Sequence, residues 1–201
     1  SLPIVFLDRK PVFLEKMLRE EGFENLILIP EGKKESIAPG LHVETFGAGS
    51  GHISSNVIDG SILFDFEDYI VLNCNDNKPE KLFCQNLASR YNHIDLAFIP
   101  SGGGSGYPAM YKNLSDEVKR EKTAKANEAF AKIFTNAVDI LHPKVVIPVA
   151  GGFVIRGPHA ETVNWFQCRP FNQLEIVDYY KQNGKFDDIK IIPLQPEMEM
   201  D

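Results

Sequence analysis

The order of short apolar runs and longer helical patterns restricts the fold of this chain more than any other feature of its sequence. Apolar runs at residues 3–7 and 26–29 enclose a helical pattern, and a charged turn is expected at residues 31–35. Further apolar runs at residues 95–100 and 145–149 flank a long amphipathic segment. Runs this short are typical of strands, and helices between strands are typical of α/β proteins. The sequence therefore predicts an α/β fold.

The stretch between these two parts predicts antiparallel strands. Residues 41–46 alternate apolar and polar side chains, which is typical of a half-buried strand. Strands are also expected at residues 53–58, 62–66 and 69–73. Asp59-Gly60 tolerates positive φ and predicts a hairpin turn between the first two of these three strands. A sheet that includes both parts of the chain would be mixed.

Three helices are expected after residue 78. The first covers residues 79–90, and the last covers residues 172–182. The longest begins after Ser115, a residue type that caps helix N-termini, and ends before Pro143. A short strand is expected at residues 189–192.

Composition limits the class of protein. The chain has 201 residues, without an internal repeat or a domain linker, and this predicts a single domain over residues 1–201. Three cysteines are too few for a disulfide scaffold of this size. The net charge of −7, from 21 basic and 28 acidic residues, argues against nucleic acid or an anionic membrane as a partner. With no targeting signal and no apolar membrane-spanning segment, the expected location is the cytoplasm.

Three residues that follow expected strand ends or glycine runs are candidate metal ligands. They are His52, Asp76 and His159. Loops at strand ends build the sites of many layered α/β proteins, and two imidazoles with one carboxylate can hold a divalent metal. The alternative is that the histidines are solvated and that Asp76 belongs to an Asn-rich turn. His42, His93 and His142 lack a comparable setting and are expected to be structural or surface residues.

A glycine-rich loop follows the expected strand at residues 95–100. Its candidate binding residues are Gly102, Gly103, Gly104, Ser105 and Tyr107. Its backbone N–H groups could hold a phosphate, although the loop lacks the Lys-Ser/Thr of a P-loop. The alternative is a tight turn that lets two stretches of backbone approach each other.

Five features in the same order resemble the metallo-β-lactamase-fold portion of CMP-N-acetylneuraminate hydroxylase-like proteins, which are relatives of ascorbate-6-phosphate lactonase-like hydrolases. They are Gly51-His52, residues 72–76, residues 101–108, the long Lys/Glu-rich helix and residues 148–154. The resemblance extends from about residue 2 to about residue 164. It implies an αβ/βα sandwich with one or two divalent metals at one edge of the two sheets.

The resemblance also implies roles for individual residues. His52, Asp76 and His159 match metal ligands, and Asp76 also acts in catalysis by bridging metals or accepting a proton from water. The glycine loop and Arg156 would hold an anionic group of the substrate. The implied substrate is a phosphorylated sugar, a nucleotide-sugar or a lactone, and the implied metal is Zn, Mn or Fe.

One part of the family pattern is missing. The His-x-His-x-Asp-His motif belongs upstream of the first expected strand, and no histidine precedes His42. The chain is therefore expected to correspond to the C-terminal part of the fold, without its N-terminal segment. An apolar sheet face would then be bare, which predicts a homo-oligomer, a partner chain or a missing segment that covers it.

Three hypotheses about function follow. The first is a metal-dependent hydrolase that attacks a small anionic substrate with metal-activated water. The second is a non-catalytic, degenerate copy of the fold that serves as a binding or interaction module. The third is an unrelated α/β protein whose glycine loop binds a phosphate.

Overall fold

The computed structural model describes residues 4–8, 13–47, 60–103, 106–150, 156–158, 160–161 and 173–194. The first elements along the chain are β1 (Ile4–Asp8), α1 (Phe13–Glu20), β2 (Leu26–Pro30), β3 (Lys34–Ala38), β4 (Leu41–Gly47), β5 (Gly60–Asp65) and β6 (Ile70–Asn73). They are followed by α2 (Lys81–Arg90), β7 (Leu96–Pro100), α3 (Asp116–Leu141), β8 (Val145–Val149), α5 (Gln173–Asn183) and β9 (Lys190–Ile191). The predicted α/β class is confirmed.

The described strands form one 7-stranded sheet and one 2-stranded sheet. In the larger sheet the order is β3-β4-β5-β6-β7-β8-β9, with antiparallel pairs from β3 to β6 and parallel pairs from β6 to β9. The smaller sheet pairs β1 with β2 in parallel. The prediction of a mixed sheet is confirmed.

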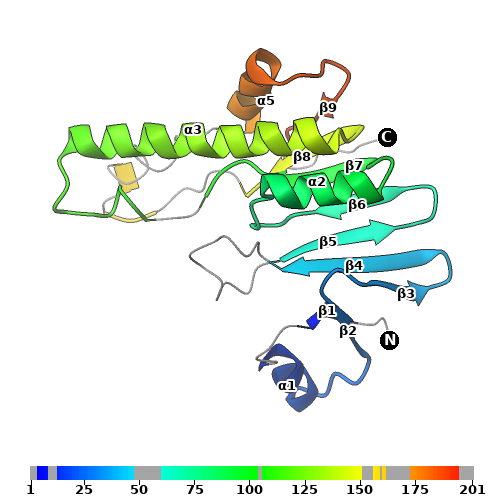
Figure 1. Ribbon diagram of the computed structural model, residues 1–201. Helices are drawn as coiled ribbons and strands as arrows, with labels where there is room; N and C mark the ends of the chain where they lie inside the picture. The colour runs from blue at the N-terminus through cyan, green and yellow to red at the C-terminus, as the bar shows by residue number, and fades with distance from the viewer. Residues whose placement is uncertain are drawn as a thin grey trace.

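The layers follow an αβ/βα order. Helices α2, α3 and α5 lie together on one side of the large sheet, while β1 and β2 lie beside β4 with α1 beyond them (Figure 1). Thr45 Oγ1 donates to Ile29 O at 3.2 Å, so a buried hydrogen bond connects the two sheets. The described part of the chain therefore has the sandwich order that the sequence resemblance implies.

Two local predictions were wrong. The charged turn predicted at residues 31–35 ends earlier, because residues 34–38 form an edge strand, β3, that the sequence did not predict. Charged side chains on an exposed edge hide the strand pattern. The Asp59-Gly60 hairpin is excluded because Gly60 pairs with Gly47, and β5 already has β4 and β6 as neighbours. The hairpin turn instead joins β5 to β6, where Glu67 has a φ of 68°. The expected strand at residues 53–58 lies outside the described residues.

The main core lies between the large sheet and its helices. Alternate residues of the central strands, including Leu63, Leu72 and Ile99, face the helices and are fully buried. Phe134 of α3 and Leu87 of α2 fill the other side. Burial of five such side chains contributes roughly 1.5–3 kcal/mol each. This core fixes the strands whose ends carry the candidate site.

Helix α3 begins and ends where the sequence predicted. The Ser115 hydroxyl accepts a hydrogen bond from Val118 N at 3.4 Å, which makes Ser115 the N-cap. At the other end His142 adopts a left-handed conformation with φ 43°, and Pro143 follows. The buried residues of α3 are concentrated in its second half, so its first half lies largely outside the core.

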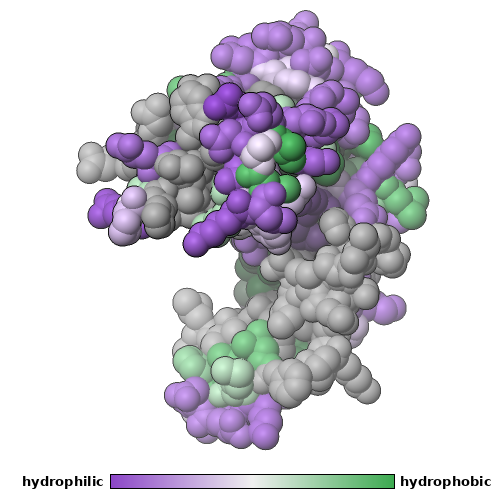
Figure 2. Space-filling view, turned by 90° about the vertical axis from the view of Figure 1, so that its left-hand side faces the viewer, coloured by the Kyte–Doolittle hydropathy of each residue, from purple (hydrophilic) through white to green (hydrophobic). Residues whose placement is uncertain are grey.

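The second face of the large sheet is apolar but less deeply buried. Val43 is fully buried beside the small sheet. Further along the same face, Phe64, Val71 and Leu96 are half-buried. Apolar surface is also exposed over α1, at the lower end of the molecule in Figure 2, where Met17 is 60% exposed. None of the helices in the described part of the chain combines the length and apolar character needed to cross a bilayer.

A buried carboxylate connects β4 to α2. Glu44 of β4 is fully buried, and it accepts hydrogen bonds from Arg90 Nη2 at 2.7 Å and from Tyr91 Oη at 2.8 Å. The Arg90 guanidinium also contacts the second carboxylate oxygen at 2.6 Å. The hydrogen bonds to one oxygen and the ion-pair contact to the other fix the orientation of the arginine relative to the carboxylate. They therefore set the position of the C-terminal end of α2 over β4.

A second buried carboxylate connects the N-terminal ends of the parallel strands. Asp95, which is 3% exposed, accepts from Ile70 N at 2.8 Å and from Lys144 Nζ at 2.6 Å. His93 Nε2 lies 3.3 Å from the same carboxylate. Burial raises the pKa of Asp95, but Lys144, the Ile70 N–H and His93 outweigh it and hold the pKa below its usual value. Asp95 thus connects the starts of β6, β7 and β8.

This arrangement predicts a dependence of stability on pH. Because the pKa of Asp95 is lowered in the folded state, its contribution is present above the unfolded value of about 3.9 and is lost as pH falls through the folded value. Asp95→Asn should lower the free energy of unfolding by about 1–3 kcal/mol at neutral pH and flatten its fall between about pH 5 and pH 2. Urea unfolding at several pH values measures both effects.

Asp188→Asn is the matched control, because the Asp188 side chain is 72% exposed and forms an ion pair with His142 at 3.3 Å. It should change the stability by less than about 0.5 kcal/mol. Equal acid dependence in Asp95→Asn and the wild type would contradict the role given to Asp95.

Candidate functional site

The candidate site lies at the edge where the parallel strands end. Asn73 of β6 pairs with Phe98 of β7, and Pro100 of β7 pairs with Val149 of β8, so the three strands finish together. At the same edge Gly47, the last residue of β4, pairs with Gly60, the first of β5. Segments 48–59, 74–80, 101–115 and 150–158 therefore all leave the sheet from one edge. These segments contain every site residue that the sequence predicted except His159, which lies one residue beyond the last of them.

Asp76 lies in a tight turn directly after β6. Asn75 has a φ of 49°, and its N–H donates to Asn73 Oδ1 at 2.8 Å. Asn77 N donates to Cys74 O at 2.8 Å, and the buried Asn77 side chain donates to Ser61 Oγ at 2.9 Å. The asparagines thus hold the turn, as the structural interpretation of this cluster predicted. The exposed Asp76 carboxylate makes no hydrogen bond or ion pair to any described residue, so it is available for a ligand.

The glycine loop begins as a close approach between two strands. Ser101 is fully buried, and its N–H donates to Val149 O at 2.8 Å. Gly102 is buried, and Gly103 packs against the side chain of Phe130 from α3. A Cβ at Gly103 would lie 2.4 Å from Phe130 Cζ, so close packing requires glycine here. Gly104 and Ser105 lie outside the described residues.

A lysine that the sequence interpretation missed contacts the same aromatic ring. Lys78 Nζ lies 4.0 Å from the centroid of Phe130, a cation–π contact. Lys78 is half-buried, and burial lowers its pKa. Its position two residues after Asp76 was the available signal, but only the fold shows that it approaches the glycine loop through Phe130.

The other candidate substrate residues are more exposed. The Tyr107 ring packs edge-on against Tyr111 with centroids 5.1 Å apart, and it is 45% exposed. Arg156 is exposed beyond β8, and it forms no hydrogen bond or ion pair with another described residue. Both lie in segments that leave the same edge of the sheet. The structure shows no contact between either residue and Asp76.

The histidine candidates divide into two groups. His52 and His159 lie outside the described residues, so their roles stay predictions. His93 and His142 contact Asp95 and Asp188 at the opposite edge of the sheet, and this agrees with the structural role expected for them. Among the described residues, no group of three or more His, Cys, Asp or Glu side chains could hold a metal ion.

Two cysteines near the turn are poor nucleophiles. Cys74 and Cys84 are free thiols in the core. Burial raises the pKa of each to about 12, so neither forms a reactive thiolate near neutral pH. Burial therefore disfavours nucleophilic chemistry by either cysteine. Asp76 is the remaining candidate for chemistry at this turn.

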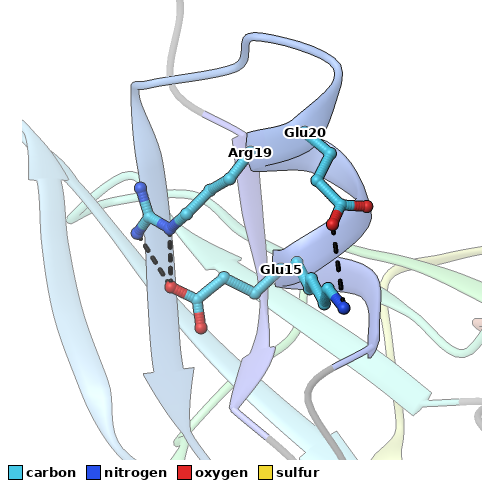
Figure 3. A pocket seen from close by; sticks show the side chains of 4 residues that line it. Glu15, Arg19 and Glu20 are labelled. Atoms are coloured by element: carbon cyan, nitrogen blue, oxygen red, sulfur yellow. Dashed lines mark hydrogen bonds and ion pairs between the residues drawn. The ribbon is translucent and has the colours of Figure 1, made fainter.

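A hollow on α1 is a separate feature and a weaker candidate. It is lined by Glu15, Lys16, Arg19 and Glu20 (Figure 3). The Arg19 side chain donates to Glu15 at 2.9 Å, and Lys16 Nζ lies 3.7 Å from Glu20 Oε1. The four side chains therefore form two ion pairs with each other. Nothing in this hollow resembles a catalytic group, and none of its residues was a candidate from the sequence.

Comparisons with solved structures identify the fold. The CmlA β-hydroxylase, in a mutant form, matches with a TM-score of 0.62 and 16% identity over 96% of this chain and 38% of that chain. The structure of CmlA, a diiron β-hydroxylase from Streptomyces venezuelae, matches with a TM-score of 0.59 and 14% identity over the same shares of the two chains. Igni18, a metallo hydrolase from Ignicoccus hospitalis, matches with a TM-score of 0.57 and 16% identity over 91% of this chain and 63% of that chain.

The protein has a metallo-β-lactamase-like fold. This confirms the fold that the sequence resemblance implies. The chain spans between 38% and 63% of the length of these matched structures. No protein-family model matches the sequence, and no curated protein matches it significantly. At 16% identity the likeness shows the fold alone.

The close contact at Gly103 predicts a specific sensitivity to substitution. Gly103→Ala places a methyl group 2.4 Å from a ring atom of Phe130, so the ring must move. This movement would disturb the contact between the ring and Lys78. We expect a loss of about 1–3 kcal/mol in the free energy of unfolding, as in other overpacked sites. Urea unfolding of the variant measures it.

Gly106→Ala is the matched control in the same loop. Its methyl group would meet the flexible Met110 side chain at 2.9 Å, which can move away at low cost. A loss at Gly106→Ala as large as that at Gly103→Ala would show that the loop, and not the contact with Phe130, determines the effect.

Proposed function

We propose that this chain is part of a metal-dependent hydrolase and that it contributes residues to the sheet edge at which the reaction is catalysed. The observation that carries the proposal is the arrival of Asp76 and the glycine loop at one edge of a metallo-β-lactamase-like sheet. The segment that contains His52 begins and ends at this edge, and the segment after β8 leads to His159.

The donor set suits a divalent metal. Asp76 offers an exposed carboxylate without a partner among the described residues, and His52 and His159 would add two imidazoles. Nitrogen and oxygen donors of these types bind Zn, Mn and Fe in proteins. The diiron centre of CmlA and the metallo hydrolase description of Igni18 belong to those proteins, and they support metal use here.

The chain's own residues would divide the work at this edge. Asp76 would hold the metal and accept a proton from the attacking water, because its carboxylate is exposed and not engaged by a described partner. The backbone N–H groups of the Gly102–Gly104 stretch, with Ser105, Tyr107 and Arg156, would orient an anionic substrate. A bound divalent metal supplies Lewis acidity and hydroxide near neutral pH.

The proposed substrate class is a phosphorylated sugar, a nucleotide-sugar or a lactone. This class rests on the sequence resemblance, and the net charge of −7 favours a small ligand over nucleic acid. The competing proposal is a non-catalytic binding module. The observation that favours it is that the described residues alone do not form a group of metal ligands.

Metal binding tests the proposal directly. The protein loaded with Zn, Mn or Fe(II) should retain metal after desalting, and Asp76→Asn should weaken binding by at least about tenfold, because a ligand matters no less than the outer-shell groups whose loss costs 10–100-fold. Metal analysis by inductively coupled plasma mass spectrometry and calorimetric titration measure these effects.

Asp68→Asn is the control, since Asp68 is exposed in the turn between β5 and β6 at the opposite edge. It should bind metal as the wild type does. A wild-type protein that retains no metal under any loading condition would favour the binding-module alternative.

A further inference from the structure

We infer that Lys78 is a further anion-binding residue of the candidate edge and that, with the Gly102–Gly103 backbone, it binds a phosphate group of a small ligand. The inference deepens the proposed function, on which it rests for the identity of the edge as a binding site. It assigns the anion to a residue that the sequence resemblance does not include.

Three separate parts of the chain meet at the Phe130 ring. Lys78 comes from the segment after β6, Gly103 from the segment after β7, and Phe130 from the side of α3 that faces the core. Lys78 Nζ lies 4.0 Å from the ring centroid, and the ring is so close to Gly103 that a Cβ there would overlap it. The ring therefore holds the ammonium group next to the glycine loop.

The charge of Lys78 is not neutralised within the described part of the chain. No described carboxylate lies within 4 Å of its ammonium group, although it is half-buried. Three other basic side chains that reach the sheet are paired with buried carboxylates: Lys34 with Asp65, Arg90 with Glu44 and Lys144 with Asp95. A cation–π contact is weaker than a desolvated ion pair, so the ammonium group retains the capacity to bind an anion.

Backbone donors belong to the loop that contacts the same ring. The N–H groups of Gly102 and Gly103 donate to no atom of the described residues, although Gly102 is buried. Buried backbone donors are normally hydrogen-bonded, and a ligand oxygen is one way to satisfy them. A phosphate group has several acceptor oxygens, so it can accept from these N–H groups and from an ammonium ion together.

The test uses inorganic phosphate and the metal-free full chain. Phosphate should shift the amide resonances of Gly102 and Gly103 in a ¹⁵N-labelled sample, with saturation at millimolar concentrations. Lys78→Gln should weaken the apparent affinity by at least tenfold, whereas Lys78→Arg should retain most of it. Lys81→Gln is the matched control, because Lys81 is exposed at the first position of α2.

Thermal unfolding of each variant separates binding from folding, and retention of binding by Lys78→Arg shows that charge at this position is what matters. Acetate should shift the same resonances less than phosphate if the site selects a tetrahedral anion. Absent shifts at Gly102 and Gly103, or equal weakening in Lys78→Gln and Lys81→Gln, would overturn the inference. Because no metal is added, a failure of metal binding leaves this result intact, and the two proposals fail separately.

Discussion

The parallel, in-register pairing of β6, β7 and β8 is the constraint on which the rest of the structure depends. It brings three strand ends, and the segments that follow them, to a single edge. The buried Asp95 carboxylate secures the other end of the same strands by accepting from Ile70 N and Lys144 Nζ. A carboxylate buried this deeply is stable only when it is paired, so the pairing and the strand alignment support each other.

The sequence predicted those elements whose signals are local. The Ser115 cap, the stop at Pro143 and the buried strand Val145–Val149 depend on neighbouring residues, and they appear as predicted. The strand Lys34–Ala38 was missed because its pairing with β4 comes from the tertiary fold, against its charged composition. At the site, the turn around Asp76 and the close approach at Gly103 were foreseeable, because asparagines and glycines favour such backbone. The approach of Lys78 to Phe130 was not, because 52 positions separate the two residues and only packing of α3 joins them.

The Phe130 ring relates the packing of the protein to its proposed chemistry. The second half of α3 lies in the main core, and Phe130, near the start of that half, contacts the glycine loop. Residues that contact the ring are therefore positioned by the core and not by the loops alone. This matters for a binding edge, because groups fixed by a packed scaffold lose less freedom when a ligand arrives. Without the Phe130 ring, the half-buried ammonium group of Lys78 would lose contact with water and gain no compensating contact with a described residue, which would disfavour folding.

The pairing of Gly47 with Gly60 has a consequence for how such an edge can change over evolution. The two residues close the ends of segment 48–59 as neighbours in the sheet, so the closure is provided by β4 and β5 themselves. Doubling the length of a loop whose ends are already held together costs only about 0.6 kcal/mol of closure entropy. Insertions or deletions in this segment can therefore accumulate without disturbing the strands. The length of this segment can therefore change while the sheet that positions Asp76 and the glycine loop stays the same.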